Sequence, residues 1–180
     1  MALRMQEHTL GSRAKLLEEM VQHYEGYGKG VKTAMEEVRR GNLRGVFGPV
    51  GELFRVSPRD TVALETALGG AMQNLVVDRE EDGKAVIQYL KRRDAGRATI
   101  LPISSIRPGE LREGASLSKE PGFVGVGDQL VRFDPKYQNV FSNLLGRVAV
   151  MEDLDAAIAA ARKYGYKFRI VTLDGQVLNP

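Results

Sequence analysis

Two segments of this sequence repeat the same alternation of strand and helix patterns, and a stretch without any pattern separates them. The first segment covers residues 26–103 and the second covers residues 123–180. Residues 104–122 combine prolines, glycines, serines and charged residues, a composition typical of a connection between subdomains. A chain of 180 residues has room for one domain or two small subdomains. We therefore expect an α/β (α+β) fold in two lobes, with mixed sheets flanked by helices.

Apolar periodicity and turn residues locate the elements within each segment. The first segment predicts helices over 31–40, 61–68 and 80–93, an interrupted strand over 45–56, and strands over 74–77 and 98–101. The second predicts helices over 134–145 and 154–164, and strands over 123–126, 130–131, 148–150 and 168–173. Asp174-Gly175 between apolar runs predicts an antiparallel hairpin that ends with Val177-Leu178.

Apolar residues recur at a seven-residue spacing in the first 25 residues. Leu3, Leu10, Leu17 and Tyr24 show this spacing, which is typical of a coiled-coil strand. An ordinary amphipathic surface helix explains the same pattern, and the sequence leaves both alternatives open. The glycine-rich residues 26–30 are expected to end this helix. A coiled-coil strand needs a partner, so on the first alternative the returning strand lies outside this sequence.

The residue types that most enzyme chemistry requires are missing from both lobes. The only histidines, His8 and His23, precede residue 26, and the chain contains no cysteine. A Ser-His-Asp triad, a histidine-rich metal site and a thiol nucleophile in the lobes are therefore excluded. No phosphate-binding P-loop and no dinucleotide-binding glycine motif is present. We expect no enzymatic activity, no catalytic residue, no metal and no cofactor.

Carboxylates cluster at two places where a strand gives way to a helix. A favourable interaction with the positive end of the helix dipole explains these positions. A magnesium site is the alternative. The two clusters are Asp78, Glu80, Glu81 and Asp82, and Glu152, Asp153 and Asp155.

Charge and hydropathy limit the class of partner. The 26 basic residues are nearly balanced by 23 acidic ones, and the net charge of +3 permits contact with nucleic acid without indicating it. No apolar run approaches the roughly 20 residues that a membrane span needs. The N-terminus is too charged for a signal peptide. We therefore expect a soluble, cytoplasmic protein with no membrane partner.

Seven short segments of the two lobes match a known family in order and spacing. They are 67–78, 85–91 and 96–102 in the first lobe, and 133–137, 143–146, 153–154 and 168–175 in the second. Together they resemble the hinge domain of bacterial structural-maintenance-of-chromosomes (SMC) proteins, over residues 24–180.

The resemblance implies a dimerisation module that joins two coiled-coil arms and contacts DNA without sequence specificity. Lobe one of each protomer would pair with lobe two of its mate. The ATPase head and the kleisin partner would act only through the full-length protein at the nucleoid, so this chain should not bind ATP. An inserted hinge also requires the chain ends, here Tyr24 and Pro180, to leave the body side by side. The family pattern continues past Pro180 into a glycine-rich part of the dimer interface.

Six residues are candidates for the dimer interface. Gly69, Gly70, Gly125 and Gly127 lie at strand or helix ends, where a missing side chain would let another backbone approach closely. A role in capping helices or forming turns is the alternative for each glycine. The resemblance also places Lys84 and Ile158 near the partner.

Two groups of cations are candidates for DNA contact. Lys91, Arg92, Arg93 and Arg97 lie at the C-terminal end of the helix over 80–93, and can contact phosphates. The second group, Arg162, Lys163 and Lys167, follows the helix over 154–164. Cations are also favoured at helix C-termini by the dipole alone. A stand-alone nucleic-acid-binding domain without obligatory dimerisation therefore remains the alternative function.

Overall fold

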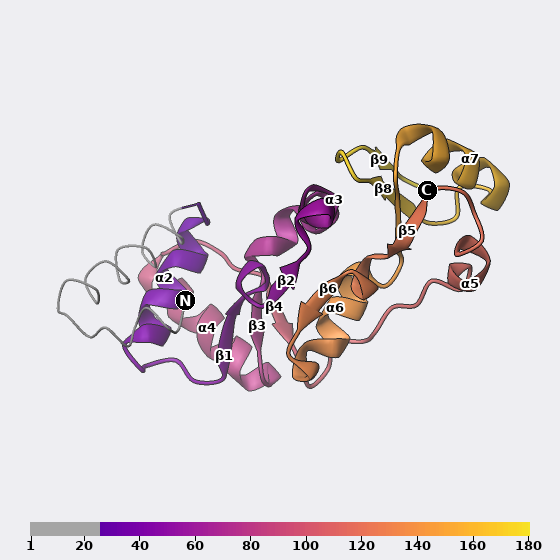
Figure 1. Ribbon diagram of the computed structural model, residues 1–180. Coiled ribbons are helices and arrows are strands. Elements are labelled where there is room, and N and C mark those ends of the chain that lie inside the picture. Colours follow the sequence, from indigo (N-terminus) through magenta and orange to yellow (C-terminus); the bar gives the residue numbers. More distant parts are fainter. Residues whose placement is uncertain (1–25) are drawn as a thin grey trace, which may run out of the picture.

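The computed structural model describes residues 26–180, which form two lobes joined side by side (Figure 1). Lobe I (residues 26–103) contains α2 (Lys29–Arg39), β1 (Val46–Pro49), β2 (Phe54–Val56), α3 (Thr61–Leu68), β3 (Leu75–Val77), α4 (Glu80–Arg93) and β4 (Ile100–Pro102). The connection carries α5 (Gly114–Leu117). Lobe II (residues 123–180) contains β5 (Phe123–Val126), β6 (Val131–Phe133), α6 (Gln138–Leu145), β7 (Val148–Met151), α7 (Leu154–Tyr164), β8 (Arg169–Thr172) and β9 (Val177–Leu178).

The two lobes share one topology. In lobe I, β3 pairs antiparallel with β1 and parallel with β4. In lobe II, β7 pairs antiparallel with β5 and parallel with β8, and β9 extends the sheet as the hairpin partner of β8. The first strand of each sheet has a register shift at an equivalent glycine, Gly48 or Gly125. The mixed α/β (α+β) fold that the sequence predicts is confirmed.

Local interactions at the helix ends explain why α4 and α7 begin and end where they do. The Asp82 carboxylate accepts a hydrogen bond from the Arg79 amide at 3.1 Å, and Asp153 accepts one from the Ala156 amide at 2.8 Å. These bonds satisfy amides that the first turn leaves without partners. Both helices stop at a left-handed residue, Asp94 or Gly165. The periodicity of the sequence therefore located these two helices correctly.

The glycine-rich segment before α2 differs from the sequence expectation. Gly30 was expected to keep the chain out of a helix, but it lies in the first turn of α2 and is buried. A Cβ at this position would be 2.0 Å from the Arg97 carbonyl oxygen. The glycine is needed because α2 packs directly against the backbone that follows α4.

A two-stranded antiparallel ladder joins the lobes. β2 of lobe I pairs with β6 of lobe II, in the register Phe54↔Phe133, Arg55↔Arg132 and Val56↔Val131. Aligning Gly48 with Gly125 makes Arg55 equivalent to Arg132, so an approximate two-fold axis of the repeat passes through this pair. The sheets of the two lobes are thereby held together by backbone hydrogen bonding as well as by side chains.

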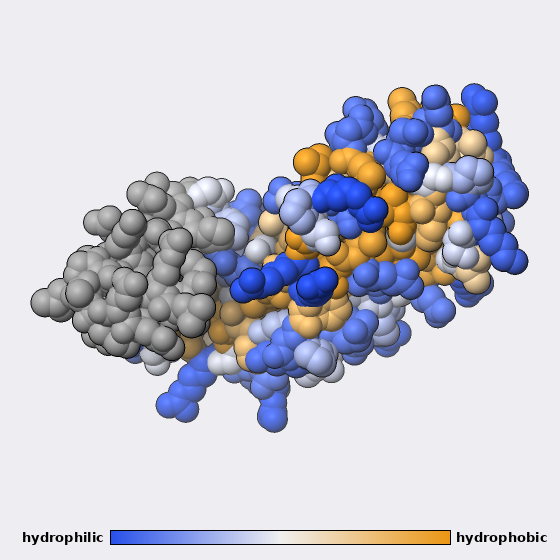
Figure 2. All heavy atoms as spheres, in the orientation of Figure 1, coloured by the Kyte–Doolittle hydropathy of each residue, from blue (hydrophilic) through white to orange (hydrophobic). Residues whose placement is uncertain are grey.

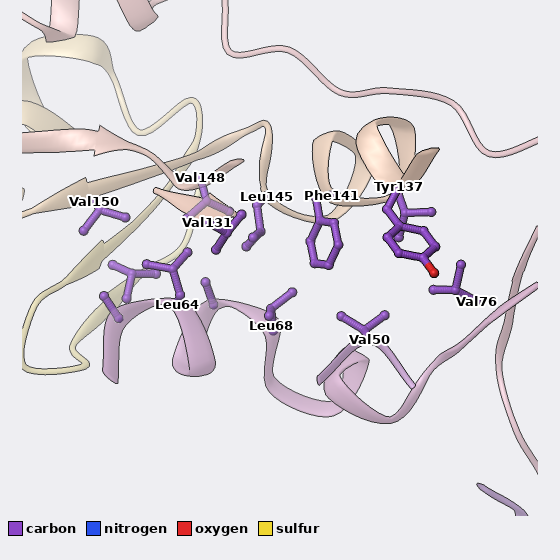
Figure 3. Close-up of a cluster of buried hydrophobic side chains, with 14 residues drawn as sticks. Val50, Leu64, Leu68, Val76, Val131, Tyr137, Phe141, Leu145, Val148 and Val150 are labelled. Carbon is purple, nitrogen blue, oxygen red and sulfur yellow. The ribbon is translucent and has the colours of Figure 1, made fainter. Parts of the chain in front are cut away.

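The largest hydrophobic core is shared by the two lobes. Figure 3 shows Leu64 and Leu68 of α3 facing Leu145 and Phe141 of α6 across this core. The Phe141 ring is fully buried. Its centre lies 5.6 Å from the centre of the Phe54 ring and 4.6 Å from the centre of the Phe133 ring. Because Phe54 belongs to lobe I and Phe133 to lobe II, this ring packs against both halves of the chain. Each lobe also has a smaller core of its own, under α2 and α4 in lobe I and under α7 in lobe II.

The expectation that Tyr24 and Pro180 leave the body side by side stays untested, because Tyr24 lies outside the described residues. The described chain enters through α2 in lobe I and leaves after β9 in lobe II, and Figure 1 shows these elements at opposite ends of the molecule. Tyr24 and the heptad pattern of residues 1–25 lie outside the described residues, so the coiled-coil expectation stays untested. Among the described helices, none is long and apolar enough to cross a membrane.

We expect Phe141→Ala to lower the free energy of unfolding by about 3 to 5 kcal/mol, because it opens a cavity between the lobes. Urea denaturation followed by circular dichroism would measure this. Phe168→Ala, in the separate core of lobe II, is the matched control for the loss of one buried ring. An unfolding midpoint for Phe141→Ala equal to that of the unsubstituted chain would contradict a shared core.

Candidate functional site

The C-terminal end of α4 gathers the first group of candidate cations. Lys91, Arg92, Arg93 and Arg97 are all exposed there. The Arg93 guanidinium lies 5.6 Å from the centre of the Tyr89 ring, which holds one cation over an aromatic face. No salt bridge is recorded for these four side chains within residues 26–180. The structure therefore brings them together, as the sequence indicates.

Lys29 also belongs to this group, although it lies far from the other four cations in the sequence. Its ammonium donates to the Asp94 carbonyl at 3.4 Å, because α2 packs against the turn after α4. The signal in the sequence was Gly30, whose missing side chain permits that packing. We call Lys29, Lys91, Arg92, Arg93 and Arg97 the basic end of lobe I.

The second group of cations is less available than the sequence suggests. Lys163 pairs with Glu120, and the hydrogen bond and charge of that carboxylate raise the pKa of Lys163. Arg162 and Lys167 remain exposed. α7 lies in lobe II, at the opposite end of the molecule from α2 and α4 (Figure 1). The two groups therefore do not form one surface on a single protomer.

Aromatic side chains near α7 offer one exposed ring. Tyr164 and Phe168 pack against each other with ring centres 5.8 Å apart, and Phe168 is buried. Tyr166 is 47% exposed and has a positive φ of 56°. A stacking surface for several bases is therefore not formed by these three rings.

The four candidate interface glycines divide into two exposed and two buried positions. Gly69 and Gly70 are exposed, and a Cβ built on either would have no atom within 4 Å. Gly125 and Gly127 are buried, and a Cβ there would lie 2.9 Å from Leu130 Cδ2 and 2.9 Å from the Leu145 carbonyl oxygen, respectively. Their close approaches are made within this chain. Contact of Gly125 and Gly127 with a second copy stays a prediction.

An apolar groove runs between α4 and β4 and has a volume of about 360 Å³. Lys84, a candidate interface residue, is on its wall, and Ile87 beside it is 44% exposed. β4 is an edge strand, since the sheet order of lobe I is β1-β3-β4. The remaining lining residues are Glu80, Gly83, Gln88, Lys91, Ile100 and Pro102.

Sequence reasoning missed Ile87 and β4 as parts of this groove. On this helix Ala85 is exposed, while Gly83 and Val86 are buried. An isoleucine at the exposed position after Val86 was the signal available. Ile158, on α7 of lobe II, is partly buried and lies far from this groove in the same protomer (Figure 1).

The acidic clusters lie at the N-terminal ends of helices, as an interaction with the helix dipole requires. Asp82 and Asp153 cap the first turns of α4 and α7. Within the described residues, no group of three or more histidine, cysteine or acidic side chains could hold a metal ion.

Comparison with known proteins identifies the family. Residues 43–161 match the model of the SMC proteins Flexible Hinge Domain. The Chromosome partition protein Smc of Bacillus subtilis is 41% identical over 171 residues, which are 94% of this chain but only 14% of that protein. This chain thus spans a small part of its curated relative.

Two solved hinge structures share the fold. A crystal structure of an asymmetric dimer of the Geobacillus stearothermophilus SMC hinge domain matches with a TM-score of 0.86 and 42% identity, over 99% of this chain and 70% of that chain. The Pyrococcus furiosus Smc hinge domain with an extended coiled coil matches with a TM-score of 0.68 and 26% identity, over 94% of this chain and 61% of that chain.

The burial of Gly127 allows a direct test of its packing role within the chain. We expect Gly127→Ala to destabilise the protein by about 1 to 3 kcal/mol, because the new methyl group meets the Leu145 backbone. Gly70→Ala, at an open position, is the control, with an expected change within about 0.5 kcal/mol. Urea denaturation at one fixed protein concentration measures both, and equal losses would contradict the assignment.

The order of strands and helices, the shared two-lobed core and the family match over residues 43–161 agree, and the chain belongs to the SMC flexible hinge domain family.

Proposed function

We propose that this chain is the dimerisation hinge of a chromosome partition protein, which joins two coiled-coil arms and contacts DNA without sequence specificity. The observation that carries the proposal is the apolar groove beside the open edge strand β4, within a fold that matches a dimeric SMC hinge. The full-length protein would carry the arms and an ATPase head and would bind a kleisin partner. This chain would supply no catalytic part.

The groove supports dimerisation because it combines exposed apolar surface with the edge of a β-strand. Ile87 and the lining residues Ile100 and Pro102 offer apolar surface whose burial stabilises a complex. The outer edge of β4 presents backbone groups that a second strand can pair with. Lobe II of a second copy would cover this groove, with Lys84 at the rim and Ile158 on the approaching helix. Gly69 and Gly70 leave open space for a neighbouring backbone.

The basic end of lobe I supports contact with DNA. Its five cations carry no recorded salt bridge to described residues, so their charges are available to phosphates. Lysine and arginine contacts to phosphate give affinity without reading sequence. Arg162 and Lys167 could extend the contact only on a separate face, whereas Lys163 is already paired with Glu120. The setting would be the nucleoid, in the cytoplasm.

We expect Ile87→Glu to weaken dimerisation about tenfold or more, because it places a charge in the apolar groove. Sedimentation velocity over a concentration series would measure the dissociation constant. Val62→Glu is the matched control, since Val62 is also exposed but lies on α3, outside the groove. Dimerisation that is equally strong in both variants would show that the groove is not the interface.

The double variant Arg92→Gln/Arg97→Gln should bind duplex DNA more weakly while its dimerisation stays unchanged, since neither residue lines the groove. The slope of log affinity against log salt concentration should become shallower by about 1.8, since each lost phosphate contact contributes about 0.9. Fluorescence anisotropy at several salt concentrations gives this slope. Arg112→Gln/Lys119→Gln removes two exposed charges from the connection and serves as the control.

The groove variant Ile87→Glu separates the alternative function. A stand-alone nucleic-acid-binding domain would bind DNA with no dependence on the dimer. Ile87→Glu would then leave both its DNA affinity and its molecular mass in solution unchanged. An unchanged salt slope in Arg92→Gln/Arg97→Gln would instead remove the basic end of lobe I from the proposal.

A further inference from the structure

Two arginines face each other across the ladder that joins the lobes. Arg55 of β2 and Arg132 of β6 are direct partners in the antiparallel register, and both are exposed. The Cβ atoms of directly opposed residues lie about 4.5 to 5.5 Å apart, and like charges in such a pair destabilise the sheet. The protein therefore holds two positive charges together at the joint that its architecture depends on.

Neither guanidinium has an ion-pair partner within residues 26–180. The salt bridges recorded there for arginine belong to Arg40, Arg59 and Arg79. Two carboxylates, Glu52 and Asp134, line the same depression as the arginine pair. The Asp134 carboxylate is held by the amide of Lys136 at 3.1 Å, where it caps a turn. Asp134 is therefore engaged in its own turn, and Glu52 also has an interaction of its own.

The arginine pair lies in a depression of about 450 Å³ whose lining combines charged residues with apolar and aromatic ones. Leu53, Phe54, Phe133 and Tyr137 also line it. Figure 2 shows strongly hydrophilic side chains over β2 and β6, with hydrophobic surface beside them. Both arginines are exposed, so water screens the repulsion between them and the attraction of an anion to a moderate level.

We propose that Arg55 and Arg132 form a binding site for a phosphate group, which bridges the two lobes. A guanidinium donates two parallel hydrogen bonds to an oxyanion, and a phosphate has enough oxygens to accept from both arginines. The approximate two-fold axis through the pair suits a ligand with equivalent oxygens on each side. The bound charge removes the repulsion within the ladder and links β2 of lobe I to β6 of lobe II. This site is separate from the basic end of lobe I and from the groove.

The proposal is tested by the midpoint of thermal unfolding of the full chain. The midpoint is measured in chloride and in inorganic phosphate at matched ionic strength and pH. Phosphate at ten times its dissociation constant should raise the midpoint of the unsubstituted chain by about 3 to 6 °C. Arg55→Gln and Arg132→Gln should each lose most of this shift. In chloride alone, each should melt about 1 to 3 °C higher than the unsubstituted chain, because the repulsion is gone.

Arg44→Gln is the matched control, since Arg44 is an exposed arginine of lobe I that does not line the depression. It should keep the full phosphate shift. An equal phosphate shift in Arg55→Gln, Arg132→Gln and the unsubstituted chain would overturn the proposal. A lower midpoint of both variants in chloride would also overturn it, because the pair would then be stabilising without an anion.

The phosphate group could be free or part of a DNA backbone, and phosphorus NMR distinguishes the two. The line of inorganic phosphate should broaden with the unsubstituted chain and stay sharp with Arg55→Gln. If a short DNA duplex then sharpens the line, the site accepts a backbone phosphate. If the line stays broad, the site holds the free anion. A line that never broadens with the unsubstituted chain would contradict the site.

Discussion

The packing of the Phe141 ring against Phe54 and Phe133 is the interaction on which the rest of this structure depends. It lies where the ladder of β2 and β6 joins the lobes, and both lobes contribute side chains to the core around it. The sheets of the individual lobes are small, with three and four strands. Small sheets need a packed face to be stable. Sharing one core gives each lobe a partner surface and fixes how the two are oriented.

The helix α4 has two roles in the proposed function. One side of the helix borders the groove that would receive a second copy, and its C-terminal end carries the basic residues that would contact DNA. Lys91 lies on the wall of the groove and also belongs to the basic end of lobe I. Dimerisation and DNA contact would therefore meet on one element of lobe I, close to where the chain enters through α2.

The sequence predicted the elements well where local signals were strong. The helices over 61–68, 80–93 and 154–164 were located by periodicity and capping residues, and the repeated rhythm of the two segments correctly indicated two lobes. The pairing of β2 with β6 was not predictable, because the strands are short and far apart in the chain. Gly30 indicated a close approach of another backbone to α2, but not which backbone, so the addition of Lys29 to the basic end could not be anticipated.

The exposure of a site residue was predictable where local structure determines it, and its contacts were not predictable where tertiary packing determines them. The exposure of Lys91, Arg92, Arg93 and Arg97 follows from their place at a helix end, and it agrees with the structure. Whether a glycine leaves space for a second chain or for its own is decided by tertiary packing, which separates Gly69 and Gly70 from Gly125 and Gly127. The partner of Lys163 is Glu120, 43 residues away, and no local pattern reveals it.

Native-state hydrogen exchange tests the shared core most directly. The account requires the lobes to unfold as one unit, so the backbone amides of β2 and β6 should exchange with the free energy of global unfolding, as should those of the buried strand β7. Exchange of β2 and β6 through a much smaller opening, while β7 stays protected, would contradict it. The lobes would then be independent bodies in contact, and the orientation of α4 relative to lobe II would no longer be fixed by the fold.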